Sequence, residues 1–167
     1  MDALAGPVVV VCALLALAGA MKIVRPAATV GALRALHIPA SSSMVRVLGA
    51  GEVAVSIAAV ATFSRAFLVT VAAAYLAFAA FVAAAMRADT PVQSCGCFGQ
   101  ADTPPSTVHI GLNLLSAGTM FAAALTGTSG LDVILPDQPW NAAPFVLLVV
   151  ICTYLCVTAL TVLPARR

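Results

Sequence analysis

The chain has 167 residues, of which 62% are hydrophobic and 8% are charged. Soluble domains contain about 25% charged residues, so eight Lys and Arg and six Asp and Glu could not cover a water-exposed surface. The net charge of +2 comes from basic residues scattered singly, which excludes a nucleic-acid-binding patch. The composition therefore predicts a single membrane domain over residues 1–167, with the lipid bilayer as its solvent.

The first apolar stretch is Ala5–Val24, which we interpret as an uncleaved membrane helix. A secretory signal begins with positive charge, whereas Asp2 is the only charged residue before Lys22. The next stretch, Val47–Phe63, is short and contains Glu52, which we expect to face protein rather than lipid. A span needs about 20 apolar residues, a length that three further stretches meet or nearly meet: Ala66–Met86, Val108–Thr126 and Ala142–Leu163.

These stretches predict an all-α fold, a polytopic transmembrane helix bundle with five spans, or four spans plus one tilted or partial helix. Its core covers about residues 5–126, and a C-terminal span covers residues 142–163. Residues 25–45 contain Pro26 and Pro39, and we predict a loop there with no more than one interfacial helical turn. Residues 63–65 are predicted to form a tight hairpin, and residues 87–107 form the polar centre of the chain.

The basic residues predict how the bundle is oriented, because Lys and Arg concentrate in short cytoplasmic loops. With five spans, one side has only Arg65, and the other has Lys22, Arg25, Arg34, Arg46, Arg87, Arg166 and Arg167. The count predicts the orientation of a multi-pass membrane protein. Its N-terminus would lie outside, and the loop of residues 87–107 would face the cytoplasm.

Cys95-Gly96-Cys97 lies in this polar loop, where it is the strongest chemical signal of the sequence. Gly96 lacks a Cβ and allows the backbone to bend enough to bring the two sulfurs together. A disulfide closed over one residue is strained, and strained disulfides exchange readily. The spacing favours a redox pair. A metal or metalloid clip and two inert thiols are the alternatives, since two cysteines supply only half of a tetrahedral site.

His109 and Asn113 are four residues apart, so they share one face of the helix that follows the loop. His109 could lower the pKa of a thiol or transfer a proton, or it could simply be hydrogen-bonded to backbone at the interface. Asn113 lies deeper and needs a partner inside the bundle, because an unpaired amide in hydrocarbon is costly.

Lys22 and Glu52 are charges within apolar segments, and a hairpin would bring them to similar depth. Such groups face the bundle interior and usually pair, so we predict a Lys22–Glu52 ion pair, with a quinone- or proton-handling role as the alternative. Cys12, Cys152 and Cys156 lie within predicted spans. Cys152 and Cys156 share one face and could form a second redox relay, although cysteine also serves as a small apolar residue.

Several of these residues together resemble the methylamine-utilisation protein MauE family, within the wider DoxX-like group of small membrane bundles. They are Gly19-Ala20-Met21-Lys22 with Pro26, then Glu52, Cys95-Gly96-Cys97-Phe98-Gly99, His109 and Asn113. The resemblance covers most of the chain from Lys22 to about Thr126, and the Cys-Gly-Cys-Phe-Gly block is its specific part.

The resemblance implies an inner-membrane protein linked to maturation, including disulfide formation, of the methylamine dehydrogenase small subunit, with a thioredoxin-like partner. Cys95 and Cys97 match the family's cysteine pair and would be the redox centre. This chain departs from the family in having His109 where Arg is more usual. The implied role also needs thiols on the exported side, whereas the charge count places them in the cytoplasm.

The leading hypothesis is a membrane thiol–disulfide redox or maturation protein, with Cys95 and Cys97 as exchanging thiols and His109 tuning them. Such a protein could have thiol–disulfide oxidoreductase activity toward a thioredoxin-like or exported thiol protein. A metal or small-solute transporter and a non-catalytic membrane assembly factor are the alternatives. We expect no bound cofactor, since the sequence has no nucleotide-binding glycine loop and no haem motif.

Overall fold

A computed structural model describes residues 4–88, 105–128, 130 and 142–162. Within these ranges the secondary structure is entirely helical, with six helices and no strand. The all-α class predicted from the sequence is therefore confirmed. Cys95 and Cys97 lie outside the described residues.

The described chain contains five helices long and apolar enough to cross a membrane. They are α1 (Ala5–Val24), α3 (Ser42–Thr62), α4 (Arg65–Arg87), α5 (Thr107–Thr126) and α7 (Ala143–Val162). The second span begins at Ser42, earlier than the predicted Val47, because the Ser41 hydroxyl accepts a hydrogen bond from the Met44 N–H at 3.3 Å. This N-cap satisfies a donor left free at the helix start. The longer α3 reaches full spanning length, so the five-span alternative holds.

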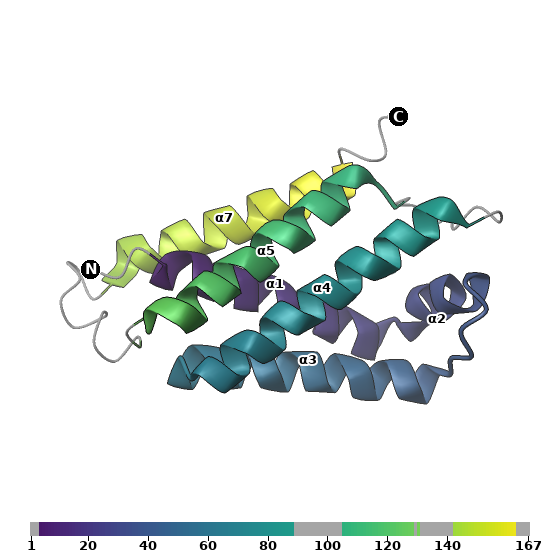
Figure 1. The fold of residues 1–167 in the computed structure, drawn as a ribbon, viewed down its shortest axis with the longest axis horizontal. Helices are drawn as coiled ribbons and strands as arrows, with labels where there is room; N and C mark the ends of the chain where they lie inside the picture. The colour runs from purple at the N-terminus through teal and green to yellow at the C-terminus, as the bar shows by residue number, and fades with distance from the viewer. Residues whose placement is uncertain (1–3, 89–104, 129, 131–141, 163–167) are drawn as a thin grey trace.

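The segment between the first two spans corrects a prediction. Pro26–Ala35 forms helix α2 rather than a loop with a single helical turn. Pro26 occupies the first turn of the helix, where its missing N–H has no intrahelical partner to lose, so the proline starts a helix instead of breaking one. After α2 the Arg34 guanidinium donates to the Ala40 carbonyl at 2.9 and 3.2 Å. Figure 1 shows α2 at one end of the bundle, beside the start of α3.

The hairpin predicted at residues 63–65 joins α3 to α4 through Phe63 and Ser64. Phe63 adopts the left-handed conformation, with φ 48°, and its N–H donates to the Ala59 carbonyl at 2.9 Å. This conformation is unfavourable for a bulky side chain. The Phe63 side chain is buried in the main core, so packing compensates for the backbone strain.

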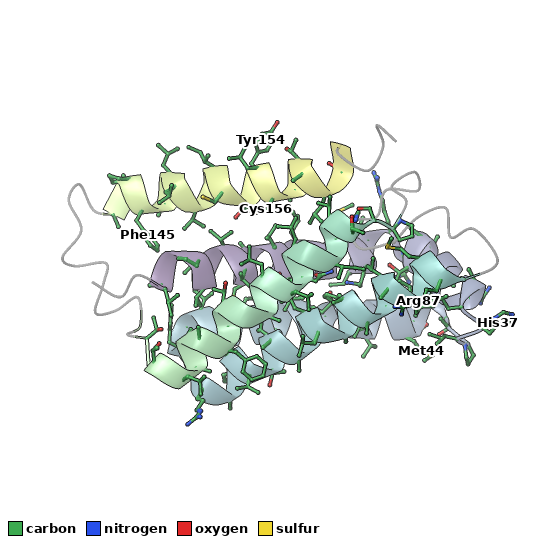
Figure 2. The ribbon with its side chains drawn as sticks, turned by 45° about the horizontal axis from the view of Figure 1, so that its top comes forward. His37, Met44, Arg87, Phe145, Tyr154 and Cys156 are labelled. Atoms are coloured by element: carbon green, nitrogen blue, oxygen red, sulfur yellow. The ribbon has the colours of Figure 1, made fainter. Side chains whose placement is uncertain are left out.

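The main hydrophobic core lies where α1, α3, α4 and α5 meet, and its side chains include Val8, Leu15, Leu68, Val71 and Met120. α1 contacts α3, α5 and α7, and α4 packs along α5. α7 is the least buried of the spans. Figure 2 shows Tyr154 of α7 pointing away from the bundle and Cys156 pointing toward it.

The two ends of the bundle differ in charge. His37, Met44 and Arg87 lie together at one end in Figure 2, and Phe145 lies at the other. α1, which has Lys22 in its last turn, ends on the side of the bundle where α2 lies. The described basic residues that the sequence count assigned to the cytoplasmic side therefore lie at one end of the bundle.

Candidate functional site

A pair of glycines allows α1 and α3 to approach closely. A Cβ added to Gly19 would lie 2.5 Å from the Gly49 carbonyl oxygen, and one added to Gly49 would lie 2.5 Å from the Gly19 carbonyl oxygen. No real side chain tolerates such a contact, so both positions require glycine. Small residues at a crossing are a common way to pack helices in lipid, where close van der Waals contact replaces the hydrophobic effect.

The glycine crossing brings Lys22 and Glu52 together. Each charged residue lies three positions after its helix's glycine, so the two side chains meet beside the crossing. Lys22 Nζ donates to Glu52 Oε2 at 2.7 Å, and the two side chains are only 4% and 5% exposed. The contact predicted between these residues is thus present. Each charge compensates the other, as charges buried within a membrane require.

The surroundings of the ion pair are largely apolar. Lys22 Nζ lies 4.7 Å from the centroid of the Phe78 ring, at a distance where the ring face attracts a cation. The second carboxylate oxygen, Glu52 Oε1, is buried and has no hydrogen-bond partner in the described part of the chain. The Arg46 guanidinium donates to the Ile23 carbonyl at 3.3 Å and satisfies an acceptor at the end of α1. These contacts fasten the end of α1 to α3.

His109 lies in the first turn of α5, which begins at the end of the bundle where α4 ends. Its side chain is 2% exposed. Nδ1 lies 2.8 Å from the Ser106 hydroxyl. Since α4 and α5 pack side by side, the Cys95–Cys97 segment joins neighbouring helices.

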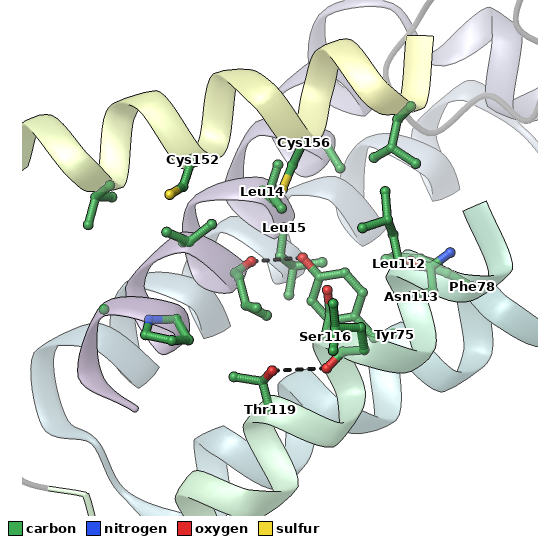
Figure 3. Close-up of a pocket in the computed structure, with 18 of the residues that line it drawn as sticks. Leu14, Leu15, Tyr75, Phe78, Leu112, Asn113, Ser116, Thr119, Cys152 and Cys156 are labelled. Carbon is green, nitrogen blue, oxygen red and sulfur yellow. Dashed lines mark hydrogen bonds between the residues drawn. The ribbon is translucent and has the colours of Figure 1, made fainter. Parts of the chain in front are cut away.

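Lys22 and Glu52 are separate from His109 and Asn113, which belong to a different feature. His109 and Asn113 both line a cavity of about 340 Å³ among α1, α4, α5 and α7. This volume is within the range of about 300–1,000 Å³ that is usual for small-molecule sites. Figure 3 shows this cavity, with Cys152 and Cys156 pointing into it from α7.

Neither this cavity nor three of its polar residues could be predicted from the sequence pattern. Tyr75 on α4 donates from its hydroxyl to the Val11 carbonyl at 2.7 Å and thereby joins α4 to α1 (Figure 3). Ser116 and Thr119 continue the α5 face that begins with His109 and Asn113. Their spacing of three to four residues was the available signal, but Ser and Thr are common in membrane helices and do not mark a site by themselves.

Taken together, the five apolar spans, the glycine crossing and the buried ion pair define a compact multi-pass membrane protein. The family model described as methylamine utilisation protein MauE matches residues 2–130. The chain therefore belongs to the MauE family.

The matched residues include α1 through α5 and exclude α7. No curated protein and no solved structure matches the chain. The match thus covers the first four spans together with the Lys22–Glu52 pair and residues 95–97, and the family links the protein to methylamine utilisation.

Proposed function

We propose that Cys95 and Cys97 form a dithiol–disulfide couple that exchanges electrons with a partner protein. The partner class proposed from the family is a thioredoxin-like protein or an exported thiol protein, such as the small subunit of methylamine dehydrogenase during its maturation. The observation that carries the proposal is the Cys-Gly-Cys segment, which lies within the family match and joins two packed membrane helices.

The exchange conserves atoms and electrons. A thiolate of the pair attacks the partner's disulfide, which forms a mixed disulfide and releases one partner thiolate. The second cysteine of the pair then attacks the mixed disulfide, closes the Cys95–Cys97 disulfide and releases the other partner thiolate. Two electrons pass from the pair to the partner, and the reverse sequence forms a disulfide in the partner.

His109 is the proposed positioning residue for this chemistry. It begins the helix that follows the thiol segment, and its contact with Ser106 holds the imidazole in place. An imidazole near a thiol stabilises the thiolate when it is protonated. Replacing His109 with Phe should therefore shift the pH dependence of thiol alkylation, whereas a purely structural role would leave that pH profile unchanged.

The redox state of the pair tests the proposal in intact cells. We expect mass tagging of free thiols to show Cys95 and Cys97 oxidised in a fraction that follows the imposed redox condition. A Cys97→Ser variant should accumulate a mixed disulfide with the partner, and Cys12→Ser, which alters a buried thiol of α1, should behave like the unaltered protein. A pair that stays reduced under every condition, with Cys→Ser variants behaving normally, would contradict the proposal.

The proposal also depends on which side of the membrane the Cys95–Cys97 segment faces. Exchange with an exported protein requires the Cys95–Cys97 segment on the exported side, opposite to the side favoured by the count of Lys and Arg. Labelling of Cys95 and Cys97 by a membrane-impermeant maleimide in intact cells separates an exported partner from a cytoplasmic one.

A further inference from the structure

The cavity among α1, α4, α5 and α7 contains polar side chains that the thiol chemistry at residues 95 and 97 does not use. Ser116 is 7% exposed, and Asn113 is half-buried one turn before it. Neither side chain has a hydrogen-bond partner within the described chain. The rest of the cavity lining is largely apolar. It includes Val10, Leu14, Phe78 and Val149.

Unpaired polar groups are costly in a membrane, because hydrocarbon offers no replacement for water. Asn113 and Ser116 both have a donor, the amide NH₂ and the hydroxyl O–H. They are three residues apart on α5, so they lie on the same face. A ligand with carbonyl oxygens would accept hydrogen bonds from these groups and remove the cost of leaving them unsatisfied.

The cavity also faces the lipid. Leu115 and Leu148 belong to its wall and are 67% and 58% exposed, respectively. They come from α5 and α7, whose mutual contact is slight compared with that between α4 and α5. A molecule dissolved in the bilayer would thus reach the cavity between α5 and α7, whereas a strongly hydrated solute would have to leave water first.

We propose that this cavity binds a membrane-soluble molecule with an apolar tail and a carbonyl head group, held by Asn113 and Ser116 and admitted from the lipid between α5 and α7. Two sources provide this chemistry, a quinone and an acyl ester lipid. The binding is independent of the thiol exchange proposed above, because none of the residues that carry it lies in the Cys95–Cys97 segment.

Cys152 and Cys156 provide a native reporter of occupancy, because both line the cavity. The full-length protein with Cys95→Ser and Cys97→Ser would be placed in detergent micelles and treated with N-ethylmaleimide. Mass spectrometry would follow the labelling rate of each remaining cysteine. The probes are decylubiquinone and monoolein, and Cys12 is the control because it is buried in the core outside the cavity.

We expect one of the probes to slow the labelling of Cys152 and Cys156 several-fold without changing the labelling of Cys12. The probe that protects identifies the source, quinone or acyl ester. Asn113→Leu and Ser116→Ala should each require about tenfold more probe for the same protection, since each removes one hydrogen bond. Thr119→Val is the matched control, because the Thr119 hydroxyl already donates to the Leu115 carbonyl at 2.9 Å.

If neither probe slows the labelling of Cys152 and Cys156, the proposal is overturned. Equal protection in Asn113→Leu, in Ser116→Ala and in the parent protein with Cys95→Ser and Cys97→Ser would overturn it as well. A second measurement covers variants that fail to fold. Native mass spectrometry of the unaltered protein should find a carbonyl-bearing lipid retained after purification, and a protein free of such lipid would count against the site. The labelling samples lack Cys95 and Cys97, and retention of a lipid by the unaltered protein does not depend on thiol exchange, so failure of that exchange would leave both results intact.

Discussion

At the scale of single residues, the Lys22–Glu52 pair shows how a membrane protein accommodates charge. Either charge alone would be strongly destabilising at this depth. Together they form a 2.7 Å contact that is almost fully buried. The pair is specific as well as tolerable, because only one alignment of α1 and α3 brings the ammonium and the carboxylate together.

Replacing only Lys22 with Met should destabilise the protein by about 3–5 kcal/mol, since Glu52 would remain buried without its partner. The double variant Lys22→Met, Glu52→Leu should recover most of this loss, because neither charge remains. Thermal unfolding in detergent micelles, followed by circular dichroism, gives the three comparisons needed. A double variant no more stable than Lys22→Met would show that the pair contributes more than compensation of charge.

The two tyrosines of the chain form a natural comparison. Tyr75 is buried and donates to the Val11 carbonyl, whereas Tyr154 is 68% exposed on the outer face of α7. Tyr75→Phe should reduce stability by about 0.5–1.5 kcal/mol through loss of one buried hydrogen bond. Tyr154→Phe should change stability by less than about 0.5 kcal/mol, as judged by the same melting measurement. Equal effects of the two substitutions would argue against the α4–α1 bond.

At the scale of helices, the closeness of α1 and α3 depends on Gly19 and Gly49. Gly19→Ala should destabilise the protein by about 1–3 kcal/mol, because the new Cβ overlaps the opposite backbone. Gly51→Ala is the control on α3, since nothing lies within 4 Å of its Cβ position. This control should be neutral or slightly stabilising, because alanine is the better helix former. Melting temperatures measure both effects, and an equal loss of stability in both variants would contradict overlap at the helix crossing as the cause.

The sequence predicted some elements well for identifiable reasons. Span positions follow from uninterrupted apolar length, and the ion pair follows from two opposite charges in such segments. The sequence did not reveal α2, because Pro26 is equally compatible with a helix start and with a loop. It did not reveal the cavity, because the cavity depends on how α7 is rotated. Apolar residues surround the whole of α7, and a helix of this kind has no preferred face in its sequence.

At the scale of the whole molecule, both ends of the bundle are defined, and the orientation in the membrane can be tested. Ser64 lies in the α3–α4 hairpin, and Ser41 lies at the opposite end before α3. With the native cysteines replaced by Ser, Ser64→Cys should react with an impermeant maleimide in intact cells and Ser41→Cys should react only after lysis. The reverse pattern would place the basic end, and the loop between α4 and α5, on the exported side.

The weak burial of α7 has a consequence for how the chain tolerates change. Phe145, Val149, Cys152, Cys156 and Leu160 face the interior side, and they recur every three or four positions. Exchange of one aliphatic residue for another on the outer side touches only lipid tails, which conform to any shape. A saturation-mutagenesis survey of α7 should therefore show intolerance in a single line along the helix, with a period of about 3.6 residues. The inward face of α7, which its hydropathy does not reveal, would then be identified by the positions that do not tolerate substitution.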